Sequence, residues 1–257
     1  MVHSWVADID RRSRDRAKGS SEHQRPRQFL GVGGKEEQGT SRSGVLFYVT
    51  RNQLVKMDKL EKALSNFLET EDARNMALLL SAAMKSGILS YDEAKTALSE
   101  EPEDILILGY GWRLIVPVRA TKSGDWEDRM LIPQSGEKYQ MPNVVRHLVE
   151  NASKTGSWEQ EKAIFDVFRS IGEPDLDKMP ILVERIASER KGHRVYGVRI
   201  KKICRELGLV ERVDALVSEL KACGILSHKL SSTTDVARAG SPIYEFNPSL
   251  LVGEATN

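Results

Sequence analysis

Apolar residues recur at helical spacing in the last third of the chain and predict three successive helices there. The helices span roughly Met179 to Lys191, Val198 to Leu207 and Val210 to Cys223. In the second helix an i, i+3, i+4, i+7 spacing places one buried stripe along its length. The residues of that stripe are Ile200, Ile203, Cys204 and Leu207. The predicted inward residues of the third helix are Val210, Val213, Val217 and Leu220.

A glycine follows each of these helices, and glycine suits the left-handed position that ends a helix. The three glycines are Gly192, Gly208 and Gly224. Beyond them, Ile225 to Leu230 and Ile243 to Phe246 predict two strands around a polar loop. Helices joined by a short turn and followed by a β-ribbon are the layout of a winged helix, a helix-turn-helix with an added wing. We therefore predict a winged-helix domain over residues 178–250.

Winged-helix modules of microbial regulators resemble the run RVYGVRIKKICRELGLVERVDALVSELKACGILSHKL. Across residues 178–247 the chain is similar above all to the C-terminal winged helix of archaeal origin-recognition initiators. The shared positions are Tyr196, Ile203 with Cys204, Leu207 with Gly208, Leu216 with Leu220, and Gly224 to Leu226. Most are core and turn positions, so the resemblance implies the fold more than the function. It covers about a quarter of the chain, and the ATPase module of the initiators has no recognisable counterpart here.

Residues 57–135 predict a first unit that begins with helices. Two are expected over Asp58 to Glu69 and Glu71 to Ser86. Ser90 starts a shorter third helix that reaches Ser99, because its hydroxyl can accept an early amide hydrogen bond.

Strands are expected to follow these helices. They are Ile105 to Leu108, Trp112 to Val118 and Arg129 to Ile132. Gly109 and Gly111 are interpreted as hairpin glycines, since no helix is expected after them. Helices followed by strands suggest a degenerate winged-helix-like unit. The predicted fold class is thus mainly α with small β-ribbons, α+β.

A helical bridge is predicted over residues 142–172. Asn143 is expected to cap Val144 to Asn151, and Trp158 to Ile171 carries an apolar face. The second of these helices is the candidate dimer helix, with burial inside the monomer as the alternative. Gly172 to Asp177 is the predicted linker.

Residues 1–56 are rich in Arg, Ser, Gly and Gln without apolar periodicity, which predicts a disordered basic tail. The tail is either an arm that grips phosphates or a floppy extension, and the composition favours the extension. Another alternative places the natural start at Met57. The glycines before Lys35 do not make a phosphate loop, because Phe29 and Glu36 replace essential residues of that motif. Val45 to Val49 is expected to form a lone strand.

The formal net charge of +1 hides an uneven distribution. Residues 1–56 hold 11 Lys and Arg against 6 Asp and Glu, and residues 57–177 hold 14 against 22. Residues 178–250 hold 13 against 8. A basic winged helix beside an acidic body fits a nucleic-acid contact, and it equally fits two domains that attract each other.

Enzymatic chemistry has little support in the sequence. No two of the five histidines stand at the i+3 or i+4 spacing that metal ligation from one helix uses, and no G-x-S-x-G elbow occurs. Cys204 and Cys223 are expected to be free thiols in a reducing cytoplasm, although a disulfide between them stays open. No apolar run reaches the roughly 18 residues of a membrane helix. We therefore expect a cytoplasmic, non-enzymatic protein without cofactor, metal or catalytic residues, nucleoid-associated if it binds DNA.

The leading hypothesis is that residues 178–250 bind double-stranded DNA, as in a prokaryotic transcription regulator or a chromosome-associated protein. The positive charge gathers beside the expected reading helix, so phosphate contacts and modest sequence preference are predicted. The predicted DNA-binding residues are Arg194, Arg199, Lys201, Lys202, Arg205, Arg212, Ser218, Lys229 and Arg238. Among these, Arg212 has the fork that reads guanine, and Arg238 is placed to reach a minor groove.

The alternative hypothesis is a winged helix used as a protein-interaction scaffold or adaptor. The outward face of the third helix is small and slightly acidic, which opposes an approach to phosphates. Ala215, Ser218 and Ala222 form a smooth strip on which a helix of a protein partner, or of a second copy in a homodimer, can pack.

Overall fold

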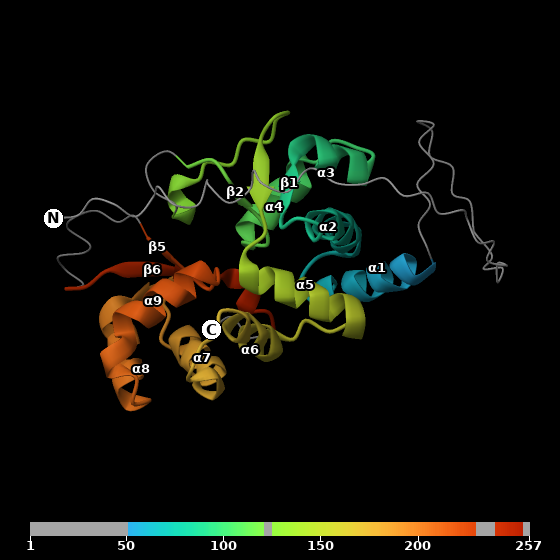
Figure 1. Cartoon of the computed structure of the whole chain (residues 1–257). Helices are drawn as coiled ribbons and strands as arrows, with labels where there is room; N and C mark the ends of the chain where they lie inside the picture. The colour runs from blue at the N-terminus through green and yellow to red at the C-terminus, as the bar shows by residue number, and fades with distance from the viewer. Residues whose placement is uncertain (1–50, 121–124, 230–239, 254–257) are drawn as a thin grey trace, which may run out of the picture. The chain divides into compact units, whose positions relative to one another are not determined.

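Two small antiparallel sheets organise the part of the chain that the computed structural model describes, residues 51–120, 125–229 and 240–253. The strand order is β1-β3-β2 in the first sheet and β4-β6-β5 in the second. Helices form most of the remainder (Figure 1). The predicted α+β class, mainly helical with small ribbons, is therefore confirmed.

The C-terminal sheet belongs to a winged-helix arrangement. Its elements are α7 (Met179–Ser188), β4 (Arg194–Tyr196), α8 (Gly197–Glu206), α9 (Val213–Ala222), β5 (Leu226–His228) and β6 (Ile243–Phe246). The central strand β6 pairs Tyr244 with Val195 of β4 and Glu245 with Ser227 of β5. The predicted helices and ribbon are thus confirmed, and the short strand β4 is added to them. We call residues 179–246 the C-terminal winged unit.

The same order of elements occurs earlier in the chain. It comprises α2 (Thr70–Ala83), β1 (Ile88–Ser90), α3 (Tyr91–Leu98), α4 (Glu103–Gly111), β2 (Val116–Pro117) and β3 (Lys138–Gln140). Ser90 caps α3 as predicted, within a reciprocal capping box with Glu93. Since helices, strands and sheet order match those of the C-terminal unit, residues 70–140 form an N-terminal winged unit.

The strand predicted at Ile105 to Leu108 is wrong, because these residues lie in helix α4. A short apolar run fits a buried helix as well as a strand. The signals that favour a helix are Pro102 at its N-cap and acidic residues in its first turn. Gly109 is consequently no hairpin glycine. It lets α4 pack closely, since a Cβ there would lie 3.0 Å from Ile115 Cγ1.

The strand predicted at Arg129 to Ile132 is also wrong, and β3 follows later, at Lys138–Gln140. Backbone carbonyls around residues 126–132 accept hydrogen bonds from tyrosine hydroxyls. In a sheet they would accept them from a neighbouring strand. Tyr110 Oη lies 3.0 Å from the carbonyl oxygens of both Trp126 and Arg129, and Tyr139 donates to Ile132 at 2.9 Å. This extended stretch therefore needs no partner strand.

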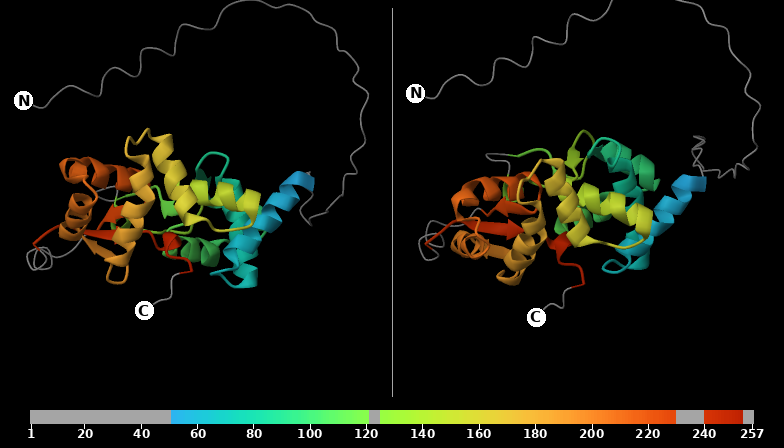
Figure 2. Two further views of the ribbon diagram at one scale, coloured as in Figure 1. Left: turned by 90° about the horizontal axis from the view of Figure 1, so that it is seen from below. Right: turned by 60° about the horizontal axis from the view of Figure 1, so that its bottom comes forward.

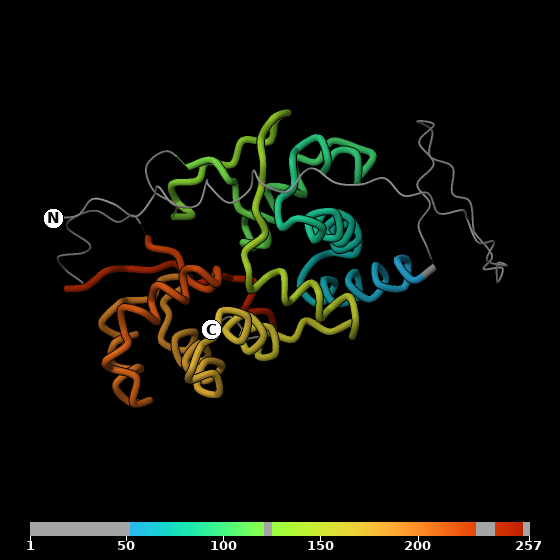
Figure 3. The backbone as a smooth tube through the Cα atoms, viewed as in Figure 1, coloured from blue at the N-terminus to red at the C-terminus, as the bar shows by residue number. Residues whose placement is uncertain are grey.

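Helices α5 (Asn143–Thr155) and α6 (Gln160–Ser170) connect the winged units, and α1 (Arg51–Leu64) precedes the first of them. Helix α5 packs on both α1 and α6, and α6 packs on α7, so the predicted bridge is confirmed. Figure 3 traces this path, and Figure 2 shows the bridge between the two units.

Two local predictions in these helices fail. Residues 51–56 belong to α1, although a disordered tail was expected to extend to residue 56. Asn143 does not cap α5; Pro142 occupies the N-cap, and the Asn143 side chain donates to the Ala222 carbonyl at 3.0 Å. The predicted tail over residues 1–50, with its lone strand at Val45 to Val49, lies outside the described residues.

One hydrophobic core runs through both winged units and the bridge. It is continuous from Leu60 and Met76 through Leu148 and Phe168 to Phe246, all fully buried. The predicted limits near residues 135–142 and 172–178 therefore mark elements within one packed body and do not separate independent domains. The α6 residues Ala163, Ile164, Val167 and Phe168 are buried in this core, as the alternative of burial within the monomer predicts, whereas Ile171 is 46% exposed.

Gly224 tests the contact between α9 and the bridge. Its φ is +76°, and a Cβ there would lie 2.5 Å from Cβ of Pro142. We expect Gly224→Ala to lower the free energy of unfolding by about 1–2 kcal/mol through left-handed strain and by about 1–3 kcal/mol more through overpacking. Urea denaturation measures this loss.

Gly172→Ala is the matched control, because φ is +78° there and no atom lies within 4 Å of the added Cβ. Its free energy of unfolding should fall only by the amount that left-handed strain costs, about 1–2 kcal/mol. Equal losses in the two variants would contradict a close contact at Pro142.

Candidate nucleic-acid interface

Helix α8 carries the densest exposed positive charge of the C-terminal winged unit. Ile200, Ile203 and Cys204 are buried, as predicted, and hold the helix against the core. The opposite side of the helix is exposed and basic, and it includes one exposed apolar residue, Val198. We call the four cations on that side, Arg199, Lys201, Lys202 and Arg205, the α8 basic face.

Glutamates next to the α8 basic face compensate it in part. Arg199 lies 3.6 Å from Glu189, and Lys202 lies 3.8 Å from Glu206, which also pairs with Arg185. All these pairs are exposed, and such pairs contribute at most about 1 kcal/mol. No described carboxylate lies within ion-pair distance of Lys201 or Arg205. The face therefore remains available to an external anion.

Arg194 stands apart from the α8 basic face. It is exposed on β4, and a tight turn joins it to Lys191, with each backbone N–H donating to the carbonyl of the other residue at 2.9 and 3.1 Å. The turn presents Lys191, His193 and Arg194 to solvent.

Arg212, predicted to read guanine, is engaged by carboxylates within the chain. Its guanidinium donates to both oxygens of Glu173, at 2.6 and 2.8 Å, and to Asp175 at 2.8 Å. Glu173 is wholly buried and comes from the predicted linker, so that segment is anchored to α9. Because the guanidinium already donates to carboxylates of the same chain, it has no free pair of N–H groups for a guanine base.

Glu219 of α9 completes this cluster, 3.5 Å from the Arg212 guanidinium. Burial, reinforced by Glu173, raises the pKa of Glu219 to about 7. The hydrogen bonds from Arg212 lower the pKa of Glu173 to about 2. Of the three carboxylates around this arginine, Glu173 and Asp175 have lowered pKa values and stay ionised, whereas Glu219 takes up a proton near neutrality.

Helix α9, the helix expected to enter the major groove, offers little to DNA. Glu211, Ala215, Ser218 and Ala222 are exposed as predicted, but Ser218 donates its hydroxyl to the Asp214 carbonyl at 2.9 Å. The buried positions are Leu216 and Leu220, whereas Val210, Val213 and Val217 are only half-buried. The register differs because α9 begins at Val213, after a 3-10 turn over Val210–Arg212.

Lys229, predicted to contact DNA, instead forms an ion pair with Glu127 of the N-terminal winged unit. In the same acidic segment, Asp125 lies 3.5 Å from Lys221 and 3.9 Å from His228. The N-terminal unit thus places carboxylates against the end of α9 and strand β5. Arg238 lies outside the described residues.

Groups for other chemistry are scarce in the described regions. Cys204 and Cys223 are buried free thiols, and burial raises the pKa of Cys223 to about 12, which disfavours a reactive thiolate. Burial also lowers the pKa of His147. Across residues 51–120, 125–229 and 240–253, no cluster of His, Cys, Asp and Glu is arranged to hold a metal.

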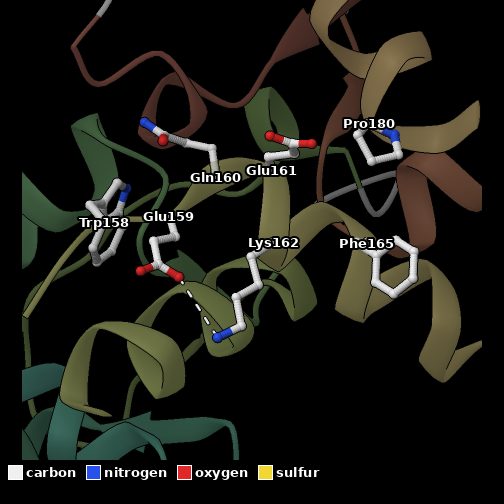
Figure 4. A pocket seen from close by; sticks show the side chains of 7 residues that line it. All are labelled: Trp158, Glu159, Gln160, Glu161, Lys162, Phe165 and Pro180. Carbon is white, nitrogen blue, oxygen red and sulfur yellow. Dashed lines mark ion pairs between the residues drawn. The ribbon is translucent and has the colours of Figure 1, made fainter. Parts of the chain in front are cut away.

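An open pocket of about 620 Å³ lies beside the start of α6 (Figure 4). Trp158, Phe165 and Pro180 supply its apolar surface, and its rim is charged. Glu159 and Lys162 pair there at 3.7 Å. Its lining contains no Ser, Cys or His, so it does not assemble a nucleophile with a base.

The described residues form two units of matching topology, each with the order of helices and strands expected of a winged helix, and helices α5 and α6 join them. The chain belongs to the protein family whose model matches residues 58–255, which takes in nearly all of the described residues. No curated protein and no solved structure matches the chain. The resemblance to origin-recognition initiators therefore stays a prediction. No helix of the described regions is long and apolar enough to cross a membrane.

Sequence reasoning missed the contacts that neutralise two of its predicted residues. Arg212 pairs with a carboxylate 39 positions away, and Lys229 with one 102 positions away. The uneven charge distribution was the one signal in the sequence that pointed to such contacts. It indicated that the acidic residues 57–177 and the basic residues 178–250 could attract each other.

Arg212→Ala should lower the free energy of unfolding by about 3 kcal/mol, because it leaves the buried Glu173 carboxylate without a partner. Urea denaturation at pH 7 measures this. Adding Glu173→Gln should recover much of the loss, since the two residues act as a pair. If Arg212→Ala left stability unchanged but abolished DNA binding, the result would support the predicted contact of Arg212 with guanine.

Glu219 should make stability depend on pH. A carboxyl whose pKa rises from 4.5 in the unfolded chain to about 7 in the folded one stabilises the fold below pH 4.5. That contribution is lost as the pH rises through about 7. We expect thermal unfolding of Glu219→Gln to lack the decline in midpoint between pH 5 and 7.5 that the unaltered chain shows. Parallel curves for the two proteins would exclude this titration.

Proposed function

We propose that the chain binds duplex DNA through phosphate contacts made by the α8 basic face. The observation that carries the proposal is the exposure of Arg199, Lys201, Lys202 and Arg205 on one side of a helix whose other side is anchored in the core. Lys201 and Arg205 have no described carboxylate partner, and the partners of the other two are exposed and weak. Phosphate contacts need no base-reading geometry, so this surface suffices for binding without strong sequence preference.

The mode of binding differs from that of a typical helix-turn-helix protein. Glu211 lies in the turn before the reading helix α9 and Asp214 in its first turn, so the start of this helix is acidic, and Lys221 near its end pairs with Asp125. Arg212 and Lys229 are engaged as well. We infer that α8, rather than α9, faces the phosphates.

A protein-interaction scaffold is the second candidate function. The exposed strip of Ala215, Ser218 and Ala222 favours it, because small side chains allow a partner helix to approach closely. A variant of this strip, such as Ala215→Glu, distinguishes the two functions. It should leave DNA affinity within about twofold if α8 binds DNA, and it should abolish capture of a stoichiometric protein partner if α9 is the contact.

Reversing three charges of the α8 basic face tests the DNA proposal. Lys201→Glu, Lys202→Glu and Arg205→Glu together should abolish binding to random duplex DNA in a gel shift at 50 mM salt. Lys62, Arg74 and Lys85 are also exposed, and reversing them gives a control with the same net charge. Equal loss of binding in both triple variants would show that net charge, not this face, governs binding.

Salt dependence supplies the second readout. If about six phosphates are contacted, the affinity of the unaltered chain should fall about a thousandfold between 50 and 200 mM salt. A flat response would refute phosphate-driven binding. Circular dichroism of each variant confirms that the fold is retained.

A further inference from the structure

A second hollow, of about 270 Å³, lies where the two winged units meet. Cationic side chains enter it from three separate segments: the end of the N-terminal unit's helices, the turn before β4, and the end of β5. They are Arg113, Lys191, Arg194 and Lys229. Two carboxylates, Glu127 and Glu245, share the lining. We call this hollow the junction pocket.

The two carboxylates are already paired across the junction. Arg113 donates to Glu245 at 2.9 Å, and both side chains are largely buried. Lys229 pairs with Glu127. Glu245 keeps one buried oxygen, Oε2, to which no described residue donates, so its charge is the main opposition to an anion. The four cations still exceed the two carboxylates by two positive charges.

The rim supplies that excess. Lys191 and Arg194 are exposed, and no described carboxylate lies within ion-pair distance of either. Both residues line the pocket, and two backbone hydrogen bonds join them across a turn that contains Gly192 and His193. Lys191 and Arg194 thus lie next to residues whose charges are already compensated by ion pairs. Two such cations are suited to bind a compact dianion.

We propose that the junction pocket binds a phosphate group. Its volume admits inorganic phosphate, pyrophosphate or the phosphate end of a small metabolite, and it is too small for a duplex. The phosphate comes either from such a small ligand or from a DNA backbone that reaches the rim. This site is separate from the α8 basic face and does not depend on DNA binding by that face.

The test uses the full chain and inorganic pyrophosphate, titrated by calorimetry in a low-salt chloride buffer. The Lys191→Ala, Arg194→Ala double variant should bind pyrophosphate at least tenfold more weakly than the unaltered chain. The matched control is the Lys62→Ala, Arg74→Ala double variant, which removes the same charge from exposed residues outside both proposed sites and should bind it unchanged. Thermal unfolding confirms that both variants fold.

Gel shifts with the same two variants identify the source of the phosphate. Unchanged DNA affinity in the Lys191/Arg194 variant assigns the pocket to a small ligand. Weaker DNA binding, with pyrophosphate as a competitor for the unaltered chain, assigns it to the backbone. Absence of pyrophosphate binding, or equal weakening in both variants, overturns the proposal. Failure of the DNA proposal would appear separately, as unaltered DNA binding after charge reversal of α8.

Discussion

The ion pair between Arg113 and Glu245 is the contact on which the arrangement of the two winged units depends. Glu245 lies in the central strand of the C-terminal sheet, and its carboxylate is about nine-tenths buried. A buried charge is costly unless a partner compensates it. The partner comes from the other unit, where Arg113 adopts a left-handed backbone and lies 4.1 Å from the centre of the Tyr110 ring. The C-terminal sheet is thus electrostatically complete only with the N-terminal unit in place.

Further contacts follow from that docking. The Trp126 backbone N–H donates to the Ser227 hydroxyl at 2.9 Å, and the Asn247 side chain donates to the Arg113 carbonyl at 3.5 Å. The acidic segment around Asp125 therefore lies against the end of α9. The same geometry that stabilises the docking leaves α8 as the exposed basic element and withdraws the reading helix from phosphate contact.

The positive charge of the C-terminal winged unit has two distinct uses. Arg212 and Lys229 hold parts of the chain together, and their distance from solvent anions follows from that role. Among the described residues, the α8 basic face forms only exposed ion pairs, and Lys191 and Arg194 have no carboxylate within ion-pair distance. Counting charges over a segment cannot separate the two groups, because burial and pairing depend on residues far away in the sequence.

The sequence predicted the C-terminal helices and ribbon because their periodicity and glycine stops act over a few residues. The buried stripe of α8 and the capping box at Ser90 are local signals of this kind. Prediction failed where a short apolar run fits two structures, as in α4, and where three-residue strands such as β1 and β4 give no period to detect. The partners of Arg212 were hidden because Glu173 lies in a segment that composition marks as a linker. For the candidate site, the exposed positions on α8 were predictable and the engaged ones were not.

The shared core has a consequence for how the molecule comes apart. Phe168 of the bridge and Phe246 of the last strand belong to the same packed interior as Leu60 of the first helix. If the chain were cut at Gly172, both fragments would expose apolar surface that is now buried. Neither fragment would therefore have a surface suited to water. We therefore expect the two winged units, despite their matching topology, to unfold together as one cooperative unit.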